Sequence, residues 1–221
     1  MLLYYITDRS QFPGEGGAKR DRLLAKIAEA AGAGVDYIQL RERDLTSCDL
    51  ERLATDALRA IGQATAKSGK PRPQLLINSR TDVALAVGAD GVHLRSHDVS
   101  AHAARQIWSS CAAAWSAGAP ARVTVAVSCH TAAEVRQAQV HGADFAVFAP
   151  VFEKQGASDA QPAGLAGLRD ATRAAIPVLA LGGITLENAA SCLEAGAAGI
   201  AAIRLFQEND IARVASALRG T

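Results

Sequence analysis

Two histidines follow or interrupt apolar runs of this sequence, and histidine is the side chain best suited to carry protons near neutral pH. His130 comes directly after one apolar run, and His93 alternates with apolar neighbours in another. Either one is a candidate general acid and base. His93 fits a structural side chain inside the fold equally well. The alternative for His130 is an ordinary residue before Thr131–Glu134, whose sequence T-A-A-E predicts a helix capping box.

A pair of glycines marks a candidate anion site. In Pro177–Asn188 an apolar run ends at Gly182 and Gly183, and a helix is expected to begin with Thr185 as its N-cap. Glycines let a backbone approach a ligand closely, and free N–H groups at a helix start attract negative charge. The alternative is a tight turn that binds nothing.

The remaining candidates are polar or cationic residues that follow other apolar runs. Together they describe a surface rich in arginine, lysine and histidine beside glycines, which suits a phosphorylated, anionic substrate. Cys129 faces away from this surface by alternation, so we interpret it as a core residue and not as a nucleophile. The candidates are Thr7, Gln39, Arg41, Arg43, Asn78, Ser128, Lys154 and Arg204, with Asp98 as a further carboxylate.

The elements that must position these residues repeat along the chain. Four segments share one pattern, in which a glycine is followed by small or acidic residues and then by an apolar run. The glycines are Gly34, Gly88, Gly142 and Gly196, separated by 54 residues each time (88−34, 142−88, 196−142). A glycine just after a helix is a common terminator, and a regular period indicates one repeated supersecondary unit.

Each period contains two strand–helix units of roughly 27 residues, the size typical of a βα unit. Strands are expected in the four glycine segments and at Leu3–Thr7, Gln74–Asn78, Arg122–Ser128 and Val178–Leu181. Helices are expected at Leu23–Ala33, Leu50–Ala66, Thr81–Val87, Ala132–Val140, Leu165–Ala175 and Glu187–Ala195. Eight such units predict a closed (β/α)8 TIM barrel that forms one α/β domain over residues 1–221. An open doubly wound sheet is the alternative, and it explains the even period less well.

A barrel also predicts where the chemistry lies. Active sites of this fold occupy the carboxyl ends of the strands, and phosphate is usually held by the loops after strands 7 and 8. Gly182 and Gly183 follow the seventh predicted strand, and Arg204 follows the eighth. That position strengthens the interpretation of the two glycines as an anion site.

Composition excludes several classes of function. The net charge of +1 gives no electrostatic case for binding nucleic acid or an anionic membrane. No apolar run is long enough to span a bilayer, and the four scattered cysteines form no metal-binding or disulfide pattern. The start of the chain lacks the features of a signal peptide, so we expect a cytoplasmic protein. The sequence is compatible with a homodimer and does not determine the assembly.

Six motifs in order resemble the superfamily of thiamine phosphate synthase and TenI, the thiazole tautomerase. They extend over almost the whole chain. The resemblance implies a role in thiamine biosynthesis and a small-molecule partner, a thiazole phosphate whose phosphate is held after strands 7 and 8. The motifs are YYITD at Tyr4–Asp8, IQLRER at Ile38–Arg43, GADGVHL at Gly88–Leu94, VSCHT at Val127–Thr131, GADFAVFAPVF at Gly142–Phe152 and LALGGITLEN at Leu179–Asn188.

Departures from the synthase pattern make the chain more similar to TenI. The synthases use Mg²⁺, held in part by the aspartate of an Asn-Asp-Arg motif after strand 3, and Ser79 stands at that position here. Asp98 matches a second metal carboxylate of that pattern. The synthases also end strand 2 in lysine, where this chain has Arg43, and they carry a threonine-rich loop after strand 6. TenI-like members share the Arg-Glu-Arg run and the Phe-Glu pair of this chain.

The resemblance therefore implies a tautomerase that aromatises a thiazole carboxylate phosphate by a proton shift. His130 matches the catalytic histidine of TenI, the two glycines and Arg204 would hold the phosphate, and Arg41 or Arg43 the carboxylate. No cofactor is expected, whereas Mg²⁺ would be needed if the protein is a synthase. The alternatives are a thiamine phosphate synthase, which couples a pyrimidine diphosphate to the thiazole phosphate, and a non-catalytic thiazole phosphate binder. One departure affects all three, because Arg204 stands where the family has a small, serine-containing strand end.

Overall fold

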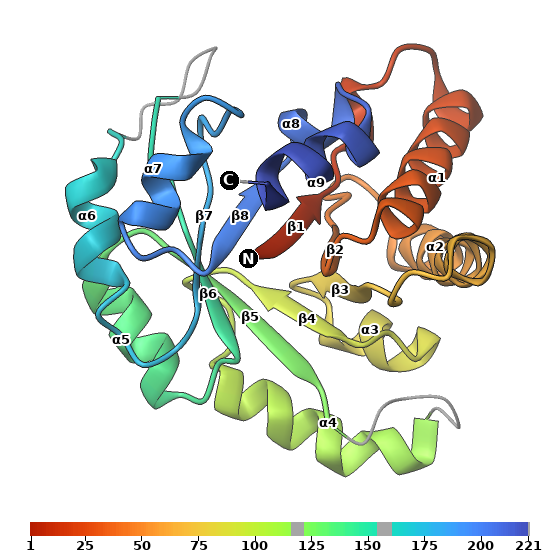
Figure 1. The fold of residues 1–221 in the computed structure, drawn as a ribbon. Coiled ribbons are helices and arrows are strands. Elements are labelled where there is room, and N and C mark those ends of the chain that lie inside the picture. Colours follow the sequence, from red (N-terminus) through yellow and green to blue (C-terminus); the bar gives the residue numbers. More distant parts are fainter. Residues whose placement is uncertain (116–121, 154–160, 221) are drawn as a thin grey trace.

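Eight parallel strands close into a barrel, as the sequence predicts (Figure 1). The structure is a computed structural model that describes residues 1–115, 122–153 and 161–220. Each strand pairs with the next in chain order, and pairing of Leu2 with Gly199 and of Tyr5 with Ala202 closes the ring. The strands are β1 (Leu2–Ile6), β2 (Tyr37–Leu40), β3 (Gln74–Asn78), β4 (Gly91–Leu94), β5 (Thr124–Cys129), β6 (Phe145–Phe148), β7 (Val178–Ala180) and β8 (Gly199–Ala202).

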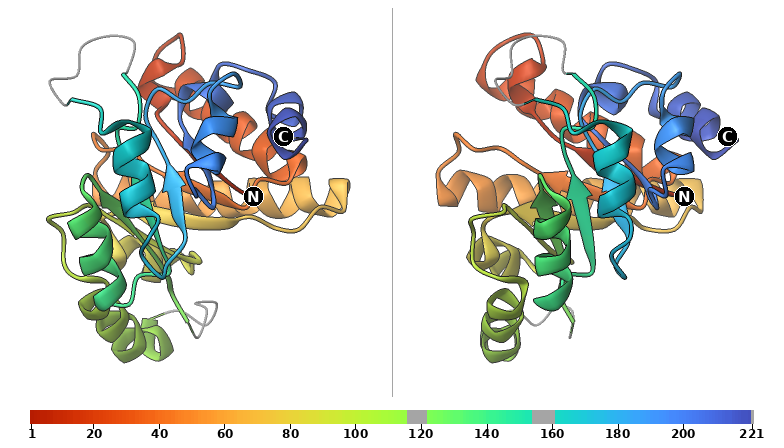
Figure 2. Two further views of the ribbon diagram at one scale, coloured as in Figure 1. Left: turned by 60° about the vertical axis from the view of Figure 1, so that its left-hand side comes forward. Right: turned by 90° about the vertical axis from the view of Figure 1, so that its left-hand side faces the viewer.

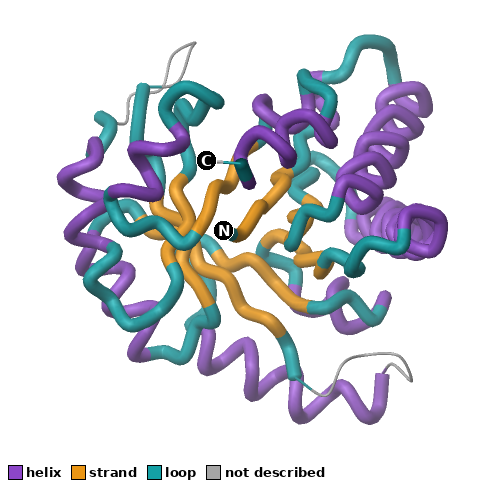
Figure 3. The backbone as a smooth tube through the Cα atoms, viewed as in Figure 1, coloured by secondary structure: helices purple, strands orange, loops and turns teal. Residues whose placement is uncertain are grey.

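The helices surround the strands, which gather at the centre in Figure 3 and lie inside the helices in both views of Figure 2. They are α1 (Gly16–Ala33), α2 (Ser47–Ser68), α3 (Thr81–Val87), α4 (Ala101–Trp115), α5 (Ala132–Val140), α6 (Gly164–Ala171), α7 (Ala189–Glu194), α8 (Arg204–Gln207) and α9 (Ile211–Arg219), with a 3-10 turn over Arg9–Gln11. None of the helices in the described ranges has the length and apolar character needed to cross a bilayer.

Alternation along the strands separates two apolar cores. On β1, Leu3 and Tyr5 face outward and pack against the helices, whereas Tyr4 and Ile6 face into the barrel. The inner core is small and contains large rings, with Tyr4 and Phe145 packed edge to face at a centroid distance of 5.6 Å. Burying apolar area on both faces of each strand is the main favourable contribution to this fold.

The 54-residue repeat has a structural purpose that the sequence pattern alone did not reveal. The aspartate two residues after each of the first three glycines turns back and accepts a hydrogen bond from a backbone N–H of the preceding strand. Asp36 accepts from Leu3, Asp90 from Leu75 and Asp144 from Val125, at 2.8, 2.8 and 2.7 Å. Each carboxylate also pairs with an arginine. These acids therefore anchor the amino-terminal ends of β1, β3 and β5.

Two predicted helix starts are wrong. Helix α1 begins at Gly16 and not at Leu23, and the prediction missed its first two turns because they are polar and glycine-containing and have no apolar pattern. Helix α7 begins at Ala189 with Asn188 as the N-cap residue, so Thr185 does not cap it. The Asn188 side chain instead accepts a hydrogen bond from the Thr185 N–H and donates one to the Gly183 carbonyl, at 2.8 and 2.9 Å. These two bonds hold the residues after the glycines in a non-helical turn, so the helix begins about three residues later than a Thr185 N-cap would place it.

Candidate active site at the carboxyl ends of the strands

Parallel pairing brings the predicted polar residues to one end of the barrel, which we call the mouth. A hydrogen-bonded chain crosses β2, β3 and the loop after β4. The Gln39 amide donates to the Asn78 side chain at 2.9 Å, and the Asn78 amide donates to the Ser79 hydroxyl at 3.2 Å. The Ser79 hydroxyl then donates to the Asp98 carboxylate at 2.6 Å. These four side chains, of Gln39, Asn78, Ser79 and Asp98, thus form one continuous polar wall.

The Asp98 carboxylate is already engaged by protein groups. It accepts from the Arg95 backbone N–H at 2.8 Å and from the Arg95 guanidinium at 2.9 Å, in addition to the Ser79 hydroxyl. Burial raises the pKa of Asp98, but the hydrogen bonds from Arg95 and Ser79 together outweigh it and hold that pKa below its ordinary value. The described residues contain no cluster of three or more acidic, histidine or cysteine side chains that could hold a metal. This wall does not fit a Mg²⁺ site, because a hard cation needs oxygen ligands that are not committed to an arginine.

A second polar group lies where β1 and β2 end, and its central residue is not among the predicted site residues. Glu42 is buried and accepts hydrogen bonds from the Thr7 hydroxyl at 2.6 Å and the Arg9 backbone N–H at 3.0 Å. The Thr7 hydroxyl accepts in turn from the Arg41 N–H at 3.0 Å. Burial raises the pKa of Glu42 above its ordinary value, against the opposing effect of these donors. The group fixes the backbone on both sides of Arg41.

Arg41 is a cation at the mouth whose side chain lacks a partner within the described ranges. Its side chain is partly buried, yet no hydrogen bond or ion pair within the described ranges engages its guanidinium. Burial, followed by the nearby charge of Arg43, lowers the pKa of Arg41 from its ordinary value. Arg43 is exposed. The charges of Asp8 and Glu42 act on the pKa of Arg41 in the opposite direction, but neither carboxylate pairs with the guanidinium in the described residues. A desolvated guanidinium without a paired anion is costly, so Arg41 is suited to receive an anionic group of a ligand.

His130 lies at the end of β5, where its ring is held in one orientation. Its Nδ1 lies 2.7 Å from the Ala149 carbonyl oxygen, and its backbone N–H donates to Glu134 at 2.7 Å. Thr131 accepts from the Glu134 N–H at 3.1 Å, so the predicted capping motif forms, with the Glu134 side chain reaching His130. Because a carbonyl only accepts, Nδ1 must carry hydrogen, and we assign Nε2 of the neutral ring as the free lone pair. The ring is exposed and therefore accessible to a ligand.

His93 has the opposite environment. It is 2 % exposed inside the barrel, with Nδ1 2.9 Å from the Tyr4 hydroxyl and Nε2 2.7 Å from the Ser128 hydroxyl. Burial, followed by the charge of Arg41, lowers the pKa of His93 to about 3. A ring that stays neutral across the physiological range does not exchange protons readily, so the structural interpretation of His93 is favoured. Cys129 is also buried, which raises its pKa to about 12 and suits a core residue.

The glycines after β7 form a narrow backbone turn against the loop after β6. Gly182 and Gly183 have φ of +99° and +62°. A Cβ atom on Gly183 would lie 2.4 Å from the Glu153 carbonyl oxygen. Within the described ranges the backbone N–H groups of residues 182–184 donate to no acceptor of the protein. Three successive free amides beside glycines are the elements of an anion cradle.

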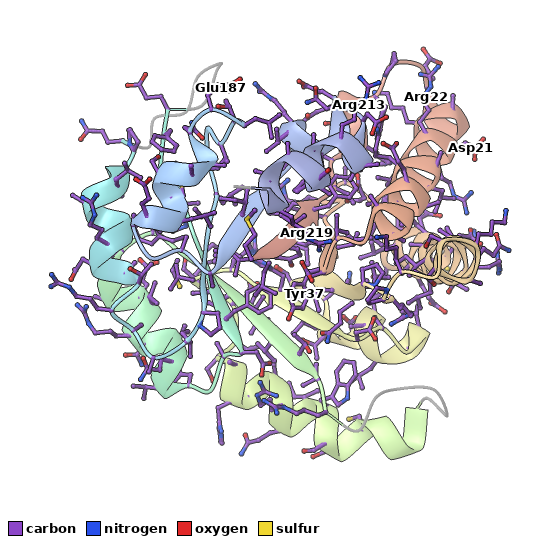
Figure 4. All side chains as sticks on the ribbon, viewed as in Figure 1. Asp21, Arg22, Tyr37, Glu187, Arg213 and Arg219 are labelled. Carbon is purple, nitrogen blue, oxygen red and sulfur yellow. The ribbon has the colours of Figure 1, made fainter. Side chains whose placement is uncertain are left out.

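Arg204 and Lys154 are the remaining predicted cations. Strand β8 ends at Ala202, and Arg204 is the exposed first residue of α8, beside the end of β7 because β7 and β8 pair. Lys154 falls outside the described residues. At the opposite, amino-terminal face, Tyr37 and Arg219, both labelled in Figure 4, line a cavity of about 340 Å³. We place the candidate site at the mouth because the free arginine, the exposed histidine and the free amides lie there.

Comparison with known proteins identifies the family. A family model described as thiamine monophosphate synthase matches residues 3–206. The chain belongs to the thiamine-phosphate synthase family. A Methanoculleus marisnigri thiamine-phosphate synthase is 36 % identical over 220 residues, which are 98 % of this chain and 93 % of the relative. A Geobacter sulfurreducens protein, provisionally named as a thiamine-phosphate synthase, is 41 % identical over 203 residues, or 91 % and 84 %.

The solved structures agree with the family assignment. A thiamine phosphate pyrophosphorylase from Pyrococcus furiosus has a TM-score of 0.76 at 28 % identity, covering 99 % of this chain and 94 % of that one. A 3-hexulose-6-phosphate synthase, at a TM-score of 0.64 and 18 % identity over 100 % and 99 % of the chains, shares the fold. The names of these three thiamine relatives describe a transferase and not the isomerisation that the resemblance to TenI implies.

Proposed function

We propose that this family member acts on a thiazole carboxylate phosphate and moves a proton on its ring, as a thiazole tautomerase. The observation that carries the proposal is the state of His130, whose Nδ1–H bond to the Ala149 carbonyl leaves Nε2 as an exposed base at the mouth. A proton shift needs one such group, and general acid–base catalysis contributes roughly 10²–10⁴-fold in rate.

The reaction balances without any other reactant. Nε2 of His130 removes a proton from a ring carbon of the non-aromatic tautomer, and the electron pair moves through the conjugated system. The same nitrogen then returns the proton to the carbon at the far end, which leaves an aromatic ring and a regenerated imidazole. The Glu134 bond to the His130 N–H holds the backbone of the base during both steps.

The anionic groups of this substrate match the free amides and the cations of the mouth. The free amides of residues 182–184 would receive the phosphate, with Arg204 as an exposed cation beside them. Arg41, partly buried and without a partner in the described residues, would receive the ring carboxylate. Gln39 on β2 and Asn78 at the end of β3, both in the polar wall, would contact the ring.

A second candidate is the coupling of a pyrimidine diphosphate to the thiazole phosphate. The names of the relatives favour it, because they describe thiamine-phosphate synthases. The polar wall argues against it, because Ser79 replaces a metal-binding acid of the synthase pattern and Asp98 is paired with Arg95.

Parallel assays with both substrate sets separate the two candidates. The purified protein is expected to convert the tautomer, followed by ultraviolet absorbance, at the same rate with Mg²⁺ or with chelator. It is expected to form no thiamine phosphate from the pyrimidine diphosphate and thiazole phosphate. Metal-dependent formation of thiamine phosphate without tautomer conversion would replace our proposal with the second candidate.

Two variants, one at each histidine, test the role of His130. In His130→Asn the side-chain amide can keep the donor at the place of Nδ1 but offers nothing at the place of Nε2. We expect it to fold, to bind the aromatic thiazole phosphate as the parent does, and to lose turnover by about 10²–10⁴-fold. Full turnover in His130→Asn, together with loss of turnover in a folded His93→Asn, would move the base to His93.

A further inference from the structure

A buried hydrogen-bonded chain joins the interior of the barrel to its mouth. It runs from the Tyr4 hydroxyl on β1, through the His93 ring on β4, to the Ser128 hydroxyl on β5. We propose that Tyr4 and His93 are positioning residues that direct the hydroxyl hydrogen of Ser128 into the mouth, as a fixed donor to an acceptor atom of the substrate. The substrate part of this inference rests on the proposed function, whereas the direction of the chain does not.

The Tyr4 hydroxyl determines the direction of the first bond. Tyr4 is fully buried among the rings of Tyr37, Phe145 and His93. Within the described residues the only hydrogen-bonding partner of its hydroxyl is His93 Nδ1, at 2.9 Å. A buried phenol whose hydrogen had no acceptor would carry the cost of an unsatisfied donor, roughly 1–3 kcal/mol. Tyr4 therefore donates, and Nδ1 accepts.

The second bond follows from the first. A neutral imidazole that accepts at Nδ1 carries its hydrogen at Nε2. Nε2 then donates to the Ser128 oxygen at 2.7 Å. The hydroxyl hydrogen of Ser128 is left over, and no other acceptor for it is found in the part of the chain that the structure describes. Ser128 shares its strand face with Ala126 in the inner core and lies one step nearer the mouth, where it is only partly buried.

The environment keeps this direction constant. Burial and the charge of Arg41 disfavour a proton on both nitrogens of His93, and they outweigh the opposing charge of Asp98. The ring thus stays neutral at physiological pH, and the chain has one arrangement of hydrogens. A fixed donor selects ligands by chemical class. It favours a carboxylate oxygen, a phosphate oxygen or a ring nitrogen at this point, and it disfavours a ligand that presents an N–H or O–H there, because two donors would face each other.

Nitrogen NMR tests the direction of the chain without any substrate. The protein has five histidines, and ¹⁵N-histidine labelling with His93→Gln as the assignment variant identifies the two nitrogens of His93. We expect the resonances of a protonated Nε2 and an unprotonated Nδ1, unchanged from about pH 5 to pH 9. A protonated Nδ1 would overturn the proposal, because Tyr4 would then accept and Ser128 would donate inward.

A double-mutant cycle tests what the chain does for the ligand, with the aromatic thiazole phosphate as the probe in calorimetry. Ser128→Ala removes the donor, and Tyr4→Phe removes only the hydroxyl that fixes the ring. Each is expected to weaken binding by about two- to tenfold, the effect of one neutral hydrogen bond. The double variant is expected to bind as Ser128→Ala does, because Tyr4 acts through Ser128.

Tyr5→Phe is the matched control. Tyr5 is the next residue of β1, is equally buried, and its hydroxyl donates to Gln207 at 3.1 Å on the other face of the strand. It is expected to lose similar stability while the His93 resonances and the affinity stay unchanged. Additive effects of Tyr4→Phe and Ser128→Ala would overturn the proposal. If the parent binds no thiazole phosphate, the proposed function and the substrate part of the inference fail together. The NMR result still decides the direction of the hydrogen bonds from Tyr4 to Ser128.

Discussion

Asp144 offers a sharp test of how the repeated acids stabilise the barrel. Its carboxylate lies 2.7 Å from the Val125 N–H and also receives the guanidinium groups of Arg105 and Arg122. Val125 is fully buried, and removing the Asp144 carboxylate takes away the acceptor of its N–H. We expect Asp144→Ala to reduce the free energy of unfolding through this unsatisfied donor more than through the lost ion pairs.

The magnitude follows from the three contacts. An unsatisfied buried N–H costs about 1–3 kcal/mol. The pair with Arg105, whose side chain is 25 % exposed, adds about 0.2–1 kcal/mol, and the pair with Arg122, which is 80 % exposed, adds almost nothing. The expected loss is about 1–4 kcal/mol. Asp144→Asn keeps an oxygen that can accept from Val125, so it should lose about 1 kcal/mol or less.

Urea unfolding measures both variants at constant m-value, with Asp170→Ala as the control. Asp170 pairs with Arg173 on the surface, and both side chains are at least half exposed, so its removal should change stability by less than about 0.5 kcal/mol. If Asp144→Asn costs as much as Asp144→Ala, the backbone acceptor is not the reason for the acid. A loss in Asp144→Ala no larger than in the control would refute the reasoning altogether.

Three further predictions concern the mouth and its support. Gly183→Val should abolish binding of thiazole phosphate and lower Tm, because φ of +62° and the Glu153 carbonyl leave no room for a Cβ. Gly32→Ala, where a Cβ meets open space, should do neither. Unchanged affinity of a folded Gly183→Val in calorimetry would show that the anion cradle lies elsewhere. The parent should bind Mg²⁺ with diphosphate weakly or not at all in calorimetry. Ser79→Asp should gain binding, since aspartate tolerates the φ of +59° at Ser79 and adds a carboxylate beside Asp98. Tight binding by the parent that Asp98→Ala abolishes would favour the synthase. The buried His93, with its pKa lowered to about 3, should cost stability as the pH falls below about 6.5, because only the unfolded chain takes up the proton. In urea unfolding the parent should lose roughly 2 kcal/mol more than His93→Gln between pH 7 and pH 5. Equal losses would show that the His93 ring can be protonated in the folded protein.

The barrel was predictable because its signals are local and repeated. Gln74–Asn78, Thr81–Val87 and Ala132–Val140 have the predicted boundaries, since apolar alternation, helical spacing and a capping motif mark them. One boundary differs because the Asn188 side chain competes with the helix after the two glycines, and another because the polar start of α1 at Gly16 has no apolar pattern. The candidate site was predictable as a set of strand ends, because in a parallel barrel all carboxyl ends lie on one side.

The sequence by itself determined which residues reach the mouth, through the period of two along each strand and the order of the strands. Tertiary structure alone decided what each of them can do there. His93 and His130 have similar positions in sequence, after or within an apolar run. Closure of the barrel places Tyr4, 89 residues away, against the buried ring of His93, while the Ala149 carbonyl orients His130 and leaves it exposed. Glu42 likewise becomes a structural acid only because β1 brings Thr7 and Arg9 to it. Protonation and hydrogen bonding depend on neighbours within about 3 Å. Those neighbours come from distant segments whose register no local pattern encodes.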